Sequence, residues 1–168
     1  TETVRDVPAP VDLSDNWQVN FPADLGAPDS IRLNTLASLS ESPEEGVRYF
    51  SGTATYSRTF LLPKGWNKPQ RRVVLDLGTV RNLAEVKING HKAGLLWAPP
   101  FQLEISDFLQ PGTNRIEIAV TNLWVNRLIG DARNTATIPE TDGWPDWVLA
   151  DKPNSGQGTY TFSPWKGW

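Results

Sequence analysis

The sequence predicts an all-β fold, an antiparallel β-sandwich in a single domain. Three observations predict it: short segments alternate apolar and polar residues, turn signals separate these segments, and no long segment has the periodicity of a helix. The polar residues at alternate positions exclude a parallel sheet that is buried on both faces. With 168 residues, the chain is long enough to enclose a sizeable core.

The composition argues against several classes of protein. A formal net charge of −3 and a pI near 5.2 argue against a protein that binds nucleic acid through its phosphates. No apolar run approaches the roughly 18 residues that a membrane-spanning helix needs. The absence of cysteine excludes disulfides and thiol chemistry. Eight tryptophans are unusual, and we expect several of them in the core, where each indole N–H needs a partner.

The N-terminal part predicts an arm, a strand and a short helical segment. Residues 1–15 contain prolines and little periodicity, so they read as an entering arm. The stretch "NWQVNF" (16–21) predicts a short first strand, and "PADLGAPDS" (22–30) predicts a loop. Residues 32–42 space three leucines as one or two helical turns would: Leu33, Leu36 and Leu39.

Strand signals are strong in five segments: residues 49–62, 71–78, 82–97, 101–109 and 111–122. Apolar side chains recur there at alternate positions and therefore face one side of a sheet. At the centre of the third segment, Asn89–Gly90 is the dipeptide of a two-residue hairpin turn. We expect the inward-facing residues to be Ala54, Tyr56, Phe60, Val73, Leu75, Leu77, Phe101, Leu103, Ile105, Ile116, Ile118 and Val120.

Residues 123–158 do not follow this alternation and are predicted to form a long loop. Connections of this length without secondary structure are uncommon and are usually functional or disordered. Disordered segments are poor in aromatic residues, whereas this one contains Trp124, Trp144 and Trp147. We therefore expect an ordered, Trp-rich loop on a rigid sandwich, which is where function tends to lie.

Three stretches in this order resemble a known family: "YFSGTATY" (49–56), "VKINGHKAGLLWAPPF" (86–101) and "TNLWVNRLIGD" (121–131). They resemble the sugar-binding jelly-roll domain, galactose-binding-like in fold, of glycoside hydrolase family 2 and related α-L-rhamnosidase-like glycosidases. The resemblance covers roughly residues 12–168. The stretch "DGWPDWVLADKPNSG" (142–156) departs from the family pattern, so the choice of ligand does not transfer.

The resemblance implies an accessory domain, with residues 1–168 excised from a larger multi-domain glycosidase. The family's catalytic carboxylates lie in a barrel domain outside this chain, so we expect no catalysis by the chain alone. The implied partners are that catalytic domain and an oligo- or polysaccharide of the plant cell-wall type. The implied location is extracellular or periplasmic.

Sugar recognition combines a flat aromatic face with planar polar groups that bind hydroxyls in pairs. The candidate ligand-binding residues are Trp124, Asn126, Arg127, Asp131, Trp144 and Trp147. A structural alternative stays open for the candidates in residues 124–131, and another stays open for Trp144 and Trp147. Trp124 would close the end of the sandwich while Arg127 and Asp131 pair and pin the loop, and the other two tryptophans would form a small hydrophobic lid.

Trp97, Pro99 and Phe101 are expected at an interface with a neighbouring domain, because in the family this stretch lies beside one. A purely structural buttress, packed on the catalytic domain without a ligand of its own, is therefore the alternative function. That alternative requires a broad apolar patch around these three residues.

No cofactor is expected. With one histidine, His91, and no cysteine, the chain lacks the ligands of a zinc site. Calcium needs several oxygen ligands, and no spacing of the EF-hand type appears, so a structural calcium ion stays an open alternative. Neither a nucleophile elbow nor a phosphate-binding loop is present in the sequence.

Overall fold

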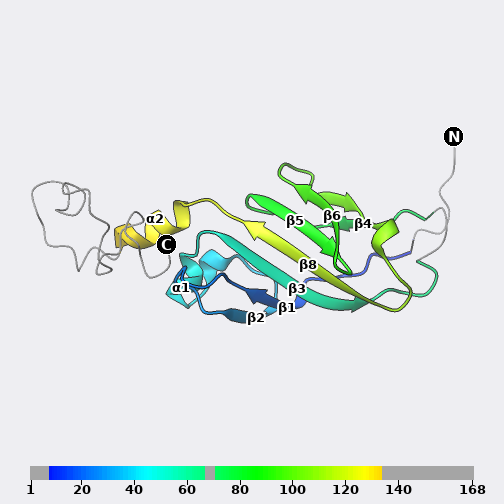
Figure 1. Cartoon of the computed structure of the whole chain (residues 1–168), viewed down its shortest axis with the longest axis horizontal. Helices are drawn as coiled ribbons and strands as arrows, with labels where there is room; N and C mark the ends of the chain where they lie inside the picture. The colour runs from blue at the N-terminus through cyan, green and yellow to red at the C-terminus, as the bar shows by residue number, and fades with distance from the viewer. Residues whose placement is uncertain (1–7, 67–70, 134–168) are drawn as a thin grey trace, which may run out of the picture.

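Two antiparallel sheets make up the computed structural model, which describes residues 8–66 and 71–133 (Figure 1). The larger sheet has six strands in the order β2-β1-β3-β8-β5-β6, and the smaller sheet pairs β4 with β7. The strands are β1 (Asp15–Asn20), β2 (Ser30–Thr35), β3 (Thr53–Leu61), β4 (Val74–Asp76), β5 (Leu83–Ile88), β6 (His91–Leu96), β7 (Gln102–Glu104) and β8 (Thr113–Thr121). The predicted all-β sandwich is confirmed.

In the described part of the chain, four short helical segments connect or follow these strands: η1 (Leu39–Glu41), α1 (Glu45–Arg48), η2 (Ser106–Phe108) and α2 (Val125–Arg133). In Figure 1, α1 and α2 lie at one end of the larger sheet, and α2 extends beyond the strands. The predicted hairpin is also confirmed. Ile88 pairs with His91, and the two turn residues have positive φ angles of 51° at Asn89 and 82° at Gly90.

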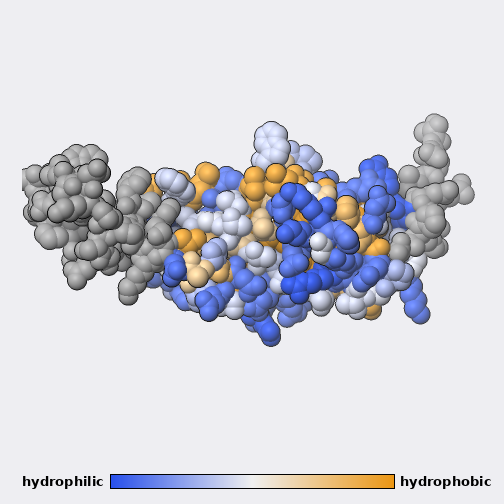
Figure 2. Space-filling model, in the orientation of Figure 1, coloured by the Kyte–Doolittle hydropathy of each residue, from blue (hydrophilic) through white to orange (hydrophobic). Residues whose placement is uncertain are grey.

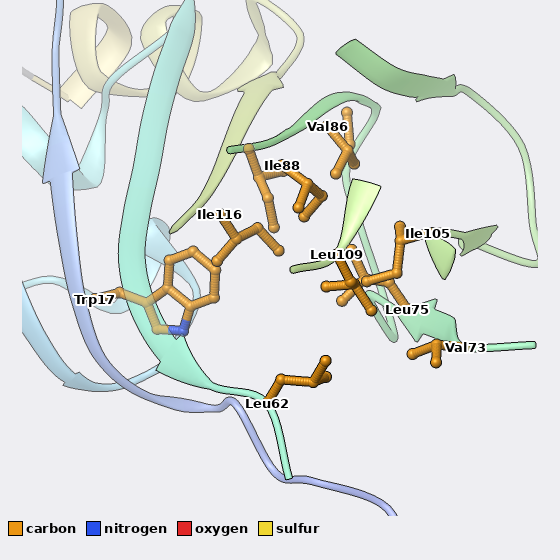
Figure 3. Packing of buried hydrophobic residues seen from close by; sticks show 11 residues of the cluster. Trp17, Leu62, Val73, Leu75, Val86, Ile88, Ile105, Leu109 and Ile116 are labelled. Atoms are coloured by element: carbon orange, nitrogen blue, oxygen red, sulfur yellow. The ribbon is translucent and has the colours of Figure 1, made fainter. Parts of the chain in front are cut away.

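The main core lies between the two sheets and contains most of the predicted inward-facing residues. Leu75 of the smaller sheet packs in one cluster with Ile88 and Ile116 of the larger sheet. Figure 3 shows the ring of Trp17 pointing from β1 toward Ile116. The indole N–H of Trp17 donates to the carbonyl of Leu13 at 2.6 Å, which satisfies the polar atom of this buried ring.

A second cluster of buried residues lies beside α1, at the end of the sheet from which α2 leaves. It comprises Val19, Phe21, Val47, Phe50 and Ala54. The rings of Phe21 and Phe50 meet edge to face, with centroids 4.9 Å apart. This cluster supports the loop that precedes β3.

The helical turns predicted for residues 32–42 are wrong for the first part of that segment. Residues up to Thr35 belong to β2, which pairs with β1 in a register that sets Leu33 opposite Trp17. Ile31 and Leu33 pack in the core, two residues apart, while Leu36 is exposed. The period of two prevails because pairing with β1 satisfies the backbone groups of both strands. Only η1 is helical.

Outside the core, the larger sheet has a polar face. The register places Gln18 opposite Ser57, Ser57 opposite Glu117, and Glu117 opposite Lys87. Gln18, Glu117 and Lys87 alternate with buried residues along their strands, so this row of residues faces away from the core. Hydrophilic residues also predominate on the side of the molecule seen in Figure 2.

Asn114 fastens the turns at the other end of the larger sheet and is fully buried. Its Oδ1 accepts from Asn89 Nδ2 at 2.8 Å and from the Gln110 N–H at 2.9 Å. Its Nδ2 donates to the carbonyls of Gln110 and Gly112. One amide therefore joins the β5–β6 hairpin to the turn before β8.

We expect Asn114→Ala to lower the free energy of unfolding by about 2–4 kcal/mol, because it leaves several buried polar groups without partners. Urea denaturation measures the change. Asn34→Ala, at an exposed position of β2, is the matched control and is expected to shift stability by less than about 0.5 kcal/mol. Equal effects of the two substitutions would contradict the role of the Asn114 network.

Burial raises the pKa of Tyr56 to about 12. In the unfolded chain the pKa returns to about 10, so the unfolded state loses its proton at lower pH than the folded state. The free energy of unfolding therefore falls as the pH rises from about 10 to about 12. We expect Tyr56→Phe to reduce this fall, measured by denaturation at several pH values. An unchanged pH slope would show that Tyr56 does not cause it.

Candidate functional site at the start of helix α2

Two distant segments of the chain are hydrogen-bonded together where β8 ends and α2 begins. We call this region the α2 junction, and it comprises residues 50–53 and 121–130. The side chain of Asn122 donates from Nδ2 to the Phe50 carbonyl at 2.8 Å and accepts from the Gly52 N–H at 2.8 Å. Its backbone N–H donates to the Gly52 carbonyl. The first and last of the three stretches that carry the family resemblance therefore form one structural unit.

Ser51 provides the cap of α2 from the other segment. Its hydroxyl accepts from the Arg127 N–H at 3.0 Å and donates to the Leu123 carbonyl at 3.1 Å. Arg127 is the third residue of the helix, and the N–H groups of a first turn have no partner within the helix. A capping residue normally satisfies this donor locally. Here the hydroxyl comes from a residue 76 positions away.

Gly130 lets α2 approach the segment before β3. A Cβ at this position would lie 2.6 Å from Cγ of Tyr49 and 2.8 Å from its Cβ. Such a distance is shorter than real carbon contacts, so a side chain at position 130 would displace the helix or the tyrosine. The close contact fixes the path of α2 past the second core cluster.

The junction separates the predicted ligand-binding residues into different environments. Trp124 is 57% exposed, Asn126 is half-buried, and Arg127 is buried at 3% exposure. Trp124 and Arg127 therefore do not share one open surface. Trp124 also does not close the end of the sandwich, because more than half of it is exposed.

The predicted long loop is wrong at its start, because Val125–Arg133 is helical. The backbone of Asp131 lies in this helix, while its side chain lies outside the described residues. Trp144 and Trp147 also lie outside the described residues. The structure thus places Asn126 and Arg127 on α2 with Trp124 directly before the helix, and leaves the other three candidates as predictions.

The three predicted interface residues also differ in their exposure to solvent. Trp97 follows β6 directly and is 75% exposed, and Pro99 is exposed beside it. Phe101 is buried, and its carbonyl accepts from the Leu77 N–H at 2.9 Å. Phe101 therefore anchors the segment to the core, so that only Trp97 and Pro99 are available to a neighbouring domain.

Sequence reasoning missed the apolar surface around the α2 junction. Five large side chains of this region are more than two-fifths exposed: Leu123, Trp124, Val125, Leu128 and Ile129. A helical reading of residues 125–133 would have found it, because it places Val125, Leu128 and Ile129 on one side. This surface adjoins the predicted ligand-binding residues.

Neither a metal site nor a membrane-spanning helix is apparent in the described chain. Across residues 8–66 and 71–133, no group of three or more His, Cys, Asp and Glu side chains is arranged to hold a metal ion. His91 is exposed at the hairpin. Over the same ranges, no helix is both long and apolar enough to cross a membrane. The calcium alternative stays untested, because four acidic residues follow residue 133: Glu140, Asp142, Asp146 and Asp151.

No protein-family model matches the chain. The chain is 41% identical, over 99% of its length, to a Formosa agariphila protein provisionally named a beta-glucuronidase, and it spans 14% of that protein. A rhamnosidase structure from Novosphingobium sp. PP1Y matches 86% of the chain with 43% identity and a TM-score of 0.73, and the match spans 13% of that protein. A beta-glucuronidase structure from an uncultured Clostridium sp. matches 71% of the chain with 23% identity and a TM-score of 0.55, which shows a shared fold. The chain is therefore similar to a small part of much larger proteins that are named as glycosidases.

Proposed function

We propose that this chain is a non-catalytic accessory domain of a larger glycosidase and that it binds carbohydrate. The observation that carries the proposal is the match to two large proteins named as glycosidases. Identity exceeds 40% over most of this chain, which spans only 13–14% of those proteins. Hydrolysis of a glycosidic bond needs two carboxylates facing each other across a pocket. We assign that step to the remainder of the larger protein.

The α2 junction is the proposed point of contact with sugar. Its hydrogen bonds to Ser51 and Asn122 hold the start of α2 on the sheet, so Trp124 is presented from a fixed position. An exposed indole offers an apolar face to the C–H side of a sugar ring. Asn126, half-buried in the first turn of α2, supplies an amide for hydroxyl groups.

Residues beyond the described part of the chain belong to the same proposal. Trp144 and Trp147 would extend the stacking surface, and Asp131 would add an acceptor, as expected from the sequence. Arg127 has a different role, because its buried position makes it a support for the helix. The polysaccharide class (plant cell wall), the sugar-binding jelly-roll type and the extracellular or periplasmic location are proposed from the family resemblance alone.

A second candidate function is the structural buttress, and the exposed apolar surface of the α2 junction favours it. Leu128 and Ile129 add to this surface without offering a polar group to a sugar. Exposed apolar patches of this kind often mark contacts between proteins or domains. In this reading the α2 junction and Trp97 pack against the catalytic domain of the larger protein, and Trp124 is covered there.

Tryptophan fluorescence during titration with a panel of plant cell-wall polysaccharides distinguishes the two functions. We expect a saturable change that is lost in Trp124→Ala, because this variant removes the stacking face, and that is weakened in Trp144→Ala and Trp147→Ala. Trp97→Ala is the matched control, since Trp97 is also exposed but lies outside the junction. A flat response across the panel would reject carbohydrate binding and favour the buttress.

Ser51→Ala tests whether the junction depends on its distant cap. The substitution leaves the Arg127 N–H without its acceptor, so we expect a loss of about 1–3 kcal/mol in the free energy of unfolding. Any sugar affinity should fall with it, because Trp124 loses its fixed position. Ser40→Ala, at an exposed position, is the control. If Ser51→Ala proves as stable as this control, the cap does not support α2.

A further inference from the structure

A second polar site lies on the outer face of the larger sheet, where a hollow with a volume of about 430 Å³ crosses four strands. The residues that line it carry amides or hydroxyls or are arginines, of which there are three. None of the described residues that line it is acidic or apolar. An excess of donors in a hollow without acidic groups favours a ligand that carries negative charge and many acceptor oxygens. This composition differs from that of the α2 junction.

The sheet register brings these groups together. Gln18 of β1 lies opposite Arg32 of β2 on one side and opposite Ser57 of β3 on the other. Thr59, two residues after Ser57, lies opposite Arg115 of β8. Since side chains two residues apart on a strand face the same side, all five project from the polar face.

The three arginines differ in what already binds them. Arg58 lies opposite Ile116 in the register, so its side chain projects from the other face of the sheet, where its Nη1 donates to the Leu13 carbonyl and to Asp15 Oδ1, each at 2.8 Å. Nη2 of Arg115 lies 3.0 Å from Oε1 of Glu117, but the side chain of Arg115 is 55% exposed. Arg32 is exposed and has no hydrogen bond or ion pair to any other residue of the described chain. Arg32 and Arg115 therefore keep guanidinium donors for a ligand.

Ser57 indicates that the hollow accommodates a polar group. It is only 9% exposed, although it belongs to the outward-facing row, and its hydroxyl has no hydrogen-bond partner among the described residues. With Asn16 and Gln18 beside it, the hydroxyl is placed to bond the hydroxyl groups of a ligand.

The dimensions favour a chain of sugar rings over a single small anion. Arg32 and Arg115 stand on strands separated by β1 and β3, which corresponds to about 14 Å across the sheet. A guanidinium binds a carboxylate through two parallel hydrogen bonds. Two such groups at this separation fit an oligosaccharide that carries a carboxylate on more than one ring. The net charge of −3 disfavours a nucleic acid as the occupant.

We propose that this hollow is a binding site for carboxylate-bearing oligosaccharides, with Arg32 and Arg115 contacting the carboxylates and Gln18 and Ser57 contacting the hydroxyl groups. The site is separate from the α2 junction. The junction adjoins the start of β3 at Thr53, whereas the hollow lies around Ser57 and Thr59, about 13–20 Å further along the strand. A ligand can therefore occupy the hollow whether or not Trp124 binds sugar.

Calorimetric titration of the 168-residue chain with tetragalacturonate tests the proposal. We expect saturable binding that disappears when the carboxylates are methyl-esterified and that weakens as the salt concentration rises. Arg32→Gln and Arg115→Gln are each expected to weaken binding at least about fivefold. Arg72→Gln is the matched control, because it removes the same charge from an exposed arginine whose partner, Glu104, lies in the smaller sheet. It should leave affinity unchanged within about twofold.

The proposal fails if tetragalacturonate does not bind, if its methyl ester binds equally well, or if Arg72→Gln weakens binding as much as Arg32→Gln. Tighter binding of a sulfated galactose tetrasaccharide would overturn the assignment to carboxylates. Trp124→Ala separates this site from the α2 junction. Unchanged tetragalacturonate affinity in that variant supports the hollow, and loss of binding there would assign the ligand to the junction instead.

Discussion

The antiparallel pairing of β3 with β8 is the constraint on which the rest of the structure depends. The two strands pair over their whole length, from Thr53 opposite Thr121 to Leu61 opposite Thr113. One face of this pair supplies core residues such as Ala54 and Ile118, and the other face supplies Ser57 and Arg115 of the hollow. Asn122 lies at one end of the pair and Asn114 lies near the other, and the side chain of each forms hydrogen bonds to another segment of the chain. Core, hollow and junction therefore share one register, and a slip by one residue would exchange the buried and exposed faces.

The sequence predicts the elements that neighbouring residues determine. It misses the elements that contacts with distant segments of the chain determine. The strands from residue 49 to residue 122 were predictable because apolar alternation and the Asn89–Gly90 turn are local signals. The start of helix α2 could not be predicted, because the hydroxyl that caps it belongs to Ser51 in another segment. Strand β2 was misread because Leu33, Leu36 and Leu39 fit a helical spacing, while partnership with β1 decides the outcome.

The candidate site shows the same division. Sequence reasoning placed Trp124, Asn126 and Arg127 together because they are neighbours in the chain, and they do lie at or directly before the start of α2. It did not foresee that Arg127 turns inward while Trp124 stays exposed, because burial depends on how α2 packs against Ser51 and Tyr49. The hollow was invisible in the sequence, since its residues come from four strands and no local motif joins them.

The contact between Gly130 and Tyr49 has a consequence for the evolution of this chain. Because a Cβ at position 130 would overlap the tyrosine, the two positions cannot vary independently while α2 keeps its path. A relative that carries a larger residue at position 130 must carry a smaller one at position 49, or its helix must leave the sheet in another direction. Covariation of this pair across related sequences would therefore reveal which domains share this exit of the helix and which have redirected it.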